Sequence, residues 1–155
     1  MKDVINKLIE LDKTISTMES CTGGCLANEI TNIEDSSMVF KYGAVTYSNE
    51  YKIKMGVSKD IIDKYTVYSM ETANEMSKVI SNYTNSDYGI GITGKLNKED
   101  VYNDTNTNNI VYVSIYEKDN NRFYNQTITV SSMDRKLNKE LIVKIIINML
   151  KDILK

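Results

Sequence analysis

Apolar residues recur along this chain with two spacings, one typical of helices and one typical of strands. Spacings of three or four residues predict amphipathic helices that begin near residues 2, 26, 50, 58, 69 and 132. Short β-branched or alternating segments predict strands at 14–18, 38–48, 88–93, 110–116 and 123–130. Helices interspersed with strands, ending in a hairpin, predict an α/β fold with a mixed sheet of about five strands and helices on both faces.

Two of these helices carry apolar stripes that predict which side chains are buried. The stripe of the helix that begins near Ser69 comprises Ala73, Met76, Ile80 and Tyr83. The last helix carries two columns, with Leu137, Leu141, Ile145, Met149 and Ile153 in the first and Ile142, Ile146, Leu150 and Leu154 in the second. A stripe of that width predicts a whole helix face buried against the sheet.

The length and continuity of the pattern predict a single domain over residues 1–155. No internal repeat or linker divides it, and Met1 is followed directly by the first predicted helix, as expected for a free-standing domain. The exception to this compact pattern is 95–109, a largely polar segment of fifteen residues without Gly or Pro. Loops of that length are commonly functional.

Composition and charge narrow the classes of function. The formal net charge of −2 argues against nucleic acid as a partner of the whole domain. No apolar run approaches a membrane span and no signal-peptide pattern is present, so we expect a cytoplasmic protein without a membrane partner. Cys21 and Cys25 are too close in sequence for a secreted disulfide framework and lack a third ligand at metal-binding spacing. No metal or other cofactor is expected.

The absence of histidine restricts the possible mechanisms more than any other feature. A Ser-His-Asp or Cys-His mechanism is impossible within this polypeptide, and so is a zinc site built on imidazole. An enzyme with a protein nucleophile must therefore use lysine, tyrosine or a carboxylate as its base.

The segment SCTGG at 20–24 lies between a predicted strand and a predicted helix. Backbone N–H groups at a helix N-terminus could bind a phosphate or an oxyanion there. An N-cap with a tight turn is an equally good interpretation, since glycine-containing strand–turn–helix segments are common in α/β proteins. Cys21 could be a nucleophile at this terminus, although packing as a small buried side chain fits it better.

Two cations are further candidates for chemistry. Lys52 follows the strand at 38–48, where partial desolvation would lower its pKa toward that of a base, with Tyr47 assisting proton transfer. A solvated lysine and a plain strand tyrosine are the alternatives. Arg135 lies in the first turn of the last predicted helix, where the helix dipole disfavours a cation. It is therefore either solvated or held for an anionic ligand such as phosphate.

Several segments, in chain order, resemble the CinA C-terminal domain family, the nicotinamide-nucleotide amidohydrolases. The two most specific are TMESCTGG at 17–24, similar to the family's TAESCTGG, and GAVTYSNEYK at 43–52, similar to GVVTYSNEAK. Further similar segments are SSMVF at 36–40, GV at 56–57, SMETA at 69–73, GITG at 91–94 and DR at 134–135. The resemblance runs through nearly the whole chain.

The resemblance implies a three-layer α/β/α fold with a mixed, mostly parallel sheet, a homodimer, and hydrolysis of the carboxamide of nicotinamide mononucleotide. It implies Ser20 as the nucleophile, Lys52 as the general base and Tyr47 as the hydrogen-bonding neighbour of Lys52. The residues expected to hold the ribose and phosphate of this small-molecule nucleotide substrate are Thr22, Gly23, Gly24, Thr93, Gly94 and Arg135. Backbone N–H groups around 21–24 would stabilise the oxyanion.

The chain departs from the family on the substrate side. The family's GIAGPGG becomes GITG at 91–94 followed by KLNKED at 95–100, which contains no Gly or Pro, and Tyr42 stands at a position that is commonly small. Two alternatives to the nicotinamide-nucleotide amidohydrolase therefore remain. One is an enzyme with the same Ser-Lys apparatus that acts on a different amide or ester. The other is a catalytically silent module that binds a nucleotide or a partner.

Overall fold

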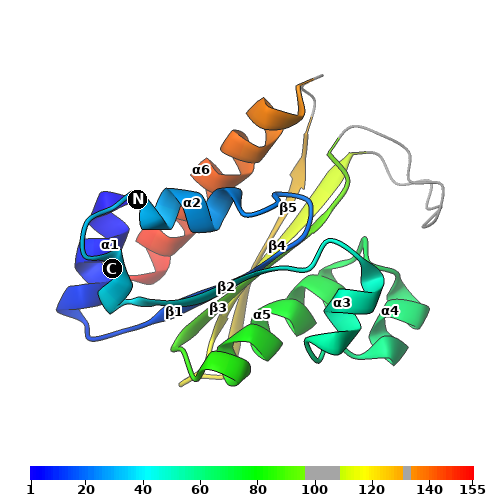
Figure 1. Cartoon of the computed structure of the whole chain (residues 1–155), viewed down its shortest axis with the longest axis horizontal. Coiled ribbons are helices and arrows are strands. Elements are labelled where there is room, and N and C mark those ends of the chain that lie inside the picture. The colour runs from blue at the N-terminus through cyan, green and yellow to red at the C-terminus, as the bar shows by residue number, and fades with distance from the viewer. Residues whose placement is uncertain (97–108, 131–133) are drawn as a thin grey trace.

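The computed structural model describes residues 1–96, 109–130 and 134–155 and has three layers, a central sheet between two groups of helices (Figure 1). The strands are β1 (Ile15–Glu19), β2 (Phe40–Val45), β3 (Tyr88–Gly94), β4 (Ile110–Glu117) and β5 (Arg122–Thr129). The helices are α1 (Lys2–Glu10), α2 (Cys25–Thr31), α3 (Asn49–Lys54), α4 (Lys59–Tyr65), α5 (Met70–Thr84) and α6 (Arg135–Ile153), with a short 3-10 helix η1 (Ser36–Met38). The predicted α/β fold is confirmed.

The five strands form one mixed sheet in the order β2–β1–β3–β4–β5. β1 is parallel to both of its neighbours, β2 and β3, whereas the β3–β4 and β4–β5 pairs are antiparallel. The carboxyl ends of β1, β2 and β3 therefore meet at one edge of the sheet. In open α/β sheets, ligands bind outside the carboxyl ends of parallel strands, so this edge is the expected place for a site.

Each face of the sheet has its own core. Helices α1, α2 and α6 cover one face and helices α3, α4 and α5 cover the other (Figure 1). The larger core includes Ile5, Leu26, Ile90, Ile92, Val113 and Ile146, on the side of α1, α2 and α6. The smaller core includes Met18, Val57, Ile62, Val67, Met76 and Ile80, on the side of α5. β1 contributes Ile15 to the larger core and Met18 to the smaller one.

Burial on α5 and α6 is narrower than their apolar stripes predict. The second column of α6, which comprises Ile142, Ile146, Leu150 and Leu154, is buried. Leu137 and Leu141 of the first column are exposed, because the helix turns one stripe rather than a whole face toward the sheet. Tyr83, at the end of the α5 stripe, is also exposed. Its ring packs at a tilt against Tyr42 of the edge strand β2, with ring centroids 5.9 Å apart. The prediction of burial was wrong for these residues.

The close approach of α5 to β3 depends on glycine. A Cβ at Gly89 would lie 1.9 Å from the Ser77 carbonyl oxygen, and a Cβ at Gly91 would lie 2.3 Å from the Ala73 carbonyl oxygen. We expect Gly89→Ala to lower the free energy of unfolding by about 3 kcal/mol, because helix backbone rather than a flexible side chain blocks the added methyl. Chemical denaturation of both proteins measures the difference. A loss smaller than about 1 kcal/mol would contradict this account of the packing.

Candidate active site

The strand alternation of β1 determines where Ser20 points. Ser16 and Met18 face α5, since the Ser16 hydroxyl donates to the Ile80 carbonyl and Met18 lies in the α5-side core. Ser20 is the next residue of this series, just past the end of β1. Its backbone N–H donates to the Ile92 carbonyl (3.0 Å) and so extends the pairing with β3. The side chain is therefore at the carboxyl edge of the sheet, on the face that carries α3 and α5.

Lys52 of α3 contacts the Ser20 side chain. The N-cap Ser48 accepts a hydrogen bond from the Tyr51 N–H and fixes the start of this helix. The Lys52 ammonium donates to Ser20 Oγ at 3.0 Å and to the Thr46 carbonyl oxygen at 2.8 Å. The structure thus brings together the two residues on which the sequence places the chemistry.

Burial changes the acidity of Lys52. The residue is only 1% exposed, and neither of its two hydrogen-bond acceptors in the described chain is a carboxylate. Desolvation disfavours the charged ammonium and lowers the pKa of Lys52 from 10.5 to about 8. At pH 7 about a tenth of the Lys52 side chains are therefore neutral amines in hydrogen-bond contact with a hydroxyl, and about half are neutral at pH 8.

Glu19 fills the N-terminus of α2. Alternation turns this residue away from Ser20 and toward α2, where it is fully buried. Its carboxylate accepts hydrogen bonds from three backbone N–H groups, those of Gly24 (3.1 Å), Leu26 (3.1 Å) and Ala27 (2.8 Å). A carboxylate at a helix N-terminus satisfies both the unpaired donors and the helix dipole. The first turn of α2 is thus capped from within the chain, so these N–H groups do not form the phosphate cradle that the SCTGG segment could have provided.

The turn between Ser20 and α2 leaves a small number of backbone donors. Gly23 and Gly24 have left-handed φ values of +60° and +93°, which glycine adopts without strain. The Gly23 N–H donates to the Ser20 carbonyl (3.0 Å). Within the described chain the N–H groups of Cys21 and Thr22 donate to no other residue. The Thr22 hydroxyl, on a residue that is 1% exposed, also lacks a partner there.

Cys21 is unsuited to nucleophilic chemistry. The side chain is buried in the larger core, and burial raises the pKa of its thiol to about 12. A thiol with that pKa is neutral at physiological pH, and the thiolate is the nucleophilic form. The structure therefore favours the packing interpretation of Cys21.

Tyr47 makes no hydrogen bond to Lys52 or Ser20 in the described part of the chain. Thr46 turns inward. Its N–H donates a hydrogen bond to the Glu19 carbonyl (2.8 Å), and its carbonyl accepts one from Lys52. The next side chain must then point outward, and Tyr47 is 66% exposed. Its hydroxyl has no hydrogen-bond partner in the described part of the chain, so the structure does not show the expected contact with Lys52.

The other residues expected to bind substrate lie at the same edge, and they differ in how far their own contacts in the fold already engage them. The Thr93 hydroxyl donates to the Val67 carbonyl (2.6 Å), so its proton is already used. Gly94 ends β3, where a Cβ would lie 2.4 Å from the Ile110 carbonyl oxygen, so close packing alone accounts for glycine there. Arg135 is the exposed first residue of α6, directly after the N-cap Asp134.

Four residues near this edge were not predicted from the sequence. They are Glu19, which caps α2; Thr46, whose carbonyl holds Lys52; Lys139 of α6, whose Nζ would lie 3.4 Å from a Cβ at Gly23; and Lys95, which contacts Tyr68. Strand alternation could have identified Glu19, because it places adjacent residues on opposite faces. Most of the unusual segment 95–109 lies outside the described residues.

The described residues hold neither a metal-binding cluster nor a membrane-spanning helix. In 1–96, 109–130 and 134–155, no group of three or more Cys, Asp or Glu residues is arranged to hold a metal ion. Over the same ranges, no helix has the length and apolar character needed to cross a membrane.

Comparison with known proteins places this arrangement in a family. The family model of the CinA C-terminal domain matches residues 1–154. The chain belongs to the CinA C-terminal domain family. Members of this family with solved structures share the three layers described above. A CinA superfamily protein from Klebsiella pneumoniae 700603 superposes with a TM-score of 0.89 at 24% identity, over 99% of this chain and 94% of that protein. Another from Escherichia coli gives a TM-score of 0.83 at 25% identity, over 92% of this chain and 81% of that protein.

Curated relatives are more similar in sequence but much longer. A competence-damage inducible protein of Clostridium kluyveri is 47% identical over 97 residues, which are 61% of this chain and 23% of that protein. A CinA-like protein of Kosmotoga olearia is 46% identical over 92 residues, 59% of this chain and 22% of that protein. The matched part of the chain thus spans under a quarter of the length of these relatives.

Proposed function

We propose that this chain hydrolyses the carboxamide of nicotinamide mononucleotide to nicotinate mononucleotide and ammonia. The observation that carries the chemical part of the proposal is the 3.0 Å hydrogen bond between the Lys52 ammonium and Ser20 Oγ. A buried lysine beside a serine hydroxyl can act as a general base next to a nucleophile, and it is one of the arrangements open to a chain without histidine. The choice of substrate comes from the family resemblance.

The proposed reaction has two stages. In the first, neutral Lys52 takes the proton of Ser20 Oγ as this oxygen attacks the carboxamide carbon, and the protonated lysine then gives a proton to the departing ammonia. In the second, Lys52 takes a proton from water as the water attacks the acyl-enzyme ester. Collapse of that intermediate returns the proton to Ser20 and releases nicotinate mononucleotide. The overall reaction consumes one water and releases one ammonia.

The Thr46 carbonyl positions the base. A neutral lysine amine has two N–H donors and one lone pair. Donation of one N–H to the Thr46 carbonyl, at 2.8 Å, restricts the rotation of the amine and lets its lone pair face Ser20 Oγ. A base held in this way needs no reorientation when the hydroxyl is deprotonated.

The oxyanion of the tetrahedral intermediate needs donors, and the turn after Ser20 supplies two candidates. The N–H groups of Gly23 and Gly24 are already bonded to the Ser20 carbonyl and the Glu19 carboxylate. We therefore propose the N–H groups of Cys21 and Thr22 instead. The N–H of the residue after the nucleophile is a frequent oxyanion donor in other serine hydrolases.

The pH dependence of the reaction tests the role of Lys52. We expect kcat/KM for nicotinamide mononucleotide to rise with pH, with an apparent pKa of about 8, and to level off above it. The rise follows because the base must be neutral, and the neutral fraction of Lys52 increases through its pKa. Ammonia release measured between pH 6 and 10, with folding checked at each end, gives the profile. A rate independent of pH across this interval would remove Lys52 from the role of base.

One observation favours a second candidate, an amidohydrolase that acts on a different amide or ester. The segment KLNKED at 95–100 replaces the end of the family's GIAGPGG motif and contains no Gly or Pro. A panel of amides and esters with related rings, tested for turnover by the same purified protein, distinguishes the two. Binding of a nucleotide without turnover of any compound would instead indicate the silent binding module.

A further inference from the structure

Lys95 lies on the same face of the sheet as Ser20 and Lys52. Gly89 and Gly91 of β3 face α5, and Thr93 follows on that face with its hydroxyl on the Val67 carbonyl. The hydrogen bond from the Ser20 N–H to the Ile92 carbonyl places Ser20 laterally beside the end of β3. Lys95 follows Gly94, the last residue of β3, and its side chain contacts Tyr68, the residue after Val67.

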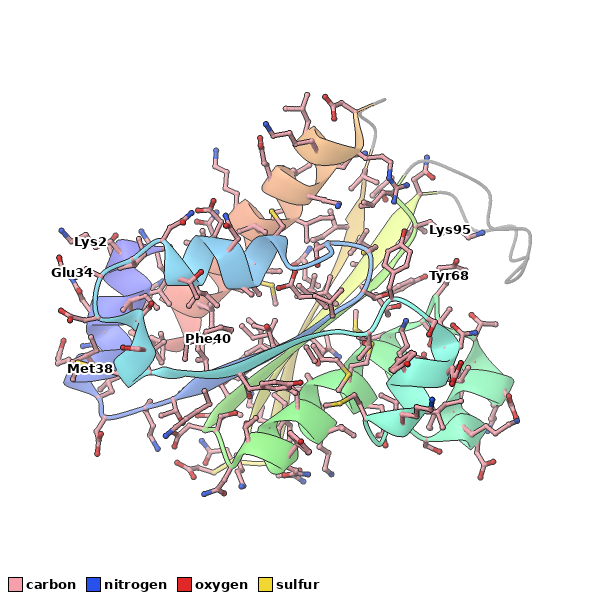
Figure 2. The ribbon with its side chains drawn as sticks, viewed as in Figure 1. Lys2, Glu34, Met38, Phe40, Tyr68 and Lys95 are labelled. Carbon is pink, nitrogen blue, oxygen red and sulfur yellow. The ribbon has the colours of Figure 1, made fainter. Side chains whose placement is uncertain are left out.

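The Lys95 side chain is held in place. The residue is 7% exposed, and its Nζ lies 4.8 Å from the ring centroid of Tyr68, just before the N-cap of α5. Figure 2 shows the two side chains together at the end of the sheet from which the β1–α2 turn also leaves. Lysine is rarely buried to this extent, and the face of an aromatic ring is a favourable place for its charge.

Glu19 occupies the N-terminus of α2, and this favours a cation at another place for a phosphorylated substrate. In many α/β proteins the phosphate binds at the helix N-terminus that follows β1. Here the Glu19 carboxylate already accepts the N–H groups of Gly24, Leu26 and Ala27 and brings a negative charge to that terminus. This charge disfavours a phosphate next to α2 and favours one beside a positive group elsewhere along the edge.

We propose that Lys95 binds the phosphate of a mononucleotide substrate and that Tyr68 positions the Lys95 ammonium for this contact. The inference rests on the proposed function, because the phosphate that Lys95 binds belongs to the same substrate whose carboxamide Ser20 attacks. A lysine ammonium is a compact point charge with three donors, suited to the oxygens of a phosphate monoester. Lys95 is thus a residue that determines specificity for a phosphorylated over an unphosphorylated nucleoside.

Binding without turnover tests this assignment. The Ser20→Ala protein is titrated by calorimetry with nicotinamide mononucleotide and with nicotinamide riboside, which differ by the phosphate. We expect the mononucleotide to bind more tightly. Adding Lys95→Met, or Lys95→Gln as a second uncharged variant, weakens mononucleotide binding by about tenfold to a hundredfold and leaves riboside binding unchanged. Lys95→Arg keeps most of the preference for the phosphorylated compound.

Lys64→Met is the matched control. Lys64 also lies over a tyrosine ring, that of Tyr65 at 5.0 Å, but it is exposed on α4. This change is expected to leave the binding of both compounds unaltered. The proposal is overturned if the uncharged Lys95 variants weaken the binding of both compounds equally. It is also overturned if folded variants bind both compounds as before, or if the mononucleotide does not bind.

The same titrations separate this proposal from the proposed function. If wild-type protein releases no ammonia but the phosphate preference depends on Lys95, the amidohydrolase proposal fails and the Lys95 assignment stands. If ammonia is released and the preference does not depend on Lys95, the assignment fails and the amidohydrolase proposal stands.

Discussion

Ser20→Ala is expected to lower kcat/KM for nicotinamide mononucleotide by at least about a thousandfold, because the nucleophilic oxygen of the reaction is removed. The structure predicts little change in folding, since Lys52 keeps its hydrogen bond to the Thr46 carbonyl and the added alanine is smaller than serine. Steady-state ammonia release measures the rate, and thermal unfolding measures the fold.

Ser36→Ala is a suitable control for this change. Ser36 is 7% exposed and Ser20 is 8% exposed, but Ser36 lies in η1, far along the chain from both Ser20 and Lys52. We expect its variant to keep wild-type activity. Activity of Ser20→Ala close to that of the Ser36→Ala protein would remove Ser20 from the mechanism.

Lys52→Met is expected to abolish activity and, at the same time, to stabilise the protein near neutral pH. A methionine of similar length fills the buried site without a charge. The difference between a pKa of 10.5 for a free lysine and about 8 in the fold corresponds to about 3 kcal/mol of unfavourable burial. The lost hydrogen bonds of the ammonium offset part of this, so we expect a gain of about 1 to 3 kcal/mol in the free energy of unfolding at pH 7.

The stability that Lys52→Met gains over the wild-type protein should decrease as the pH rises. Below pH 8 Lys52 is protonated in both the folded and the unfolded chain, so the wild-type protein carries the full cost of burying a charge. Between pH 8 and 10.5 the unfolded chain binds more protons than the folded one, and the stability of the wild-type protein rises with pH. The advantage of the variant over the wild type therefore narrows across this interval.

Denaturant unfolding at pH 7 and at pH 10 measures the free energy of unfolding of the wild-type and Lys52→Met proteins. Lys54→Met on the same helix is the control, since Lys54 is exposed and contacts Glu50 and the Tyr51 ring on the surface. It should keep activity and change stability little. A less stable, active Lys52→Met protein would show that Lys52 supports the fold rather than the chemistry.

Much of the fold could be predicted from local patterns. The spacing of apolar residues located the strands β3, β4 and β5 to within one or two residues, since alternation and turn residues mark them clearly. The strand predicted at 38–48 is longer than β2, which ends at Val45, because Thr46 turns inward to bond with Glu19 and Lys52. That turn is a tertiary effect with no local signature.

The candidate site could be predicted only in part, for the same reason. Ser20 and Lys52 were identified from the motifs. The distance of 3.0 Å between Lys52 Nζ and Ser20 Oγ requires the parallel pairing of β1 with β2. The outward direction of Tyr47 and the capping of α2 by Glu19 depend on which face each side chain takes at a strand end. Lys95 belongs to a segment that differs from the family pattern, so no motif could assign it a role.

The most direct test of the central claim is the simultaneous measurement of ammonia and nicotinate mononucleotide formed from nicotinamide mononucleotide by the purified chain. The account predicts equal amounts of the two products from the wild-type protein and none above background from Ser20→Ala. No release of either product by folded wild-type protein, or equal release by the Ser20→Ala protein, would contradict it.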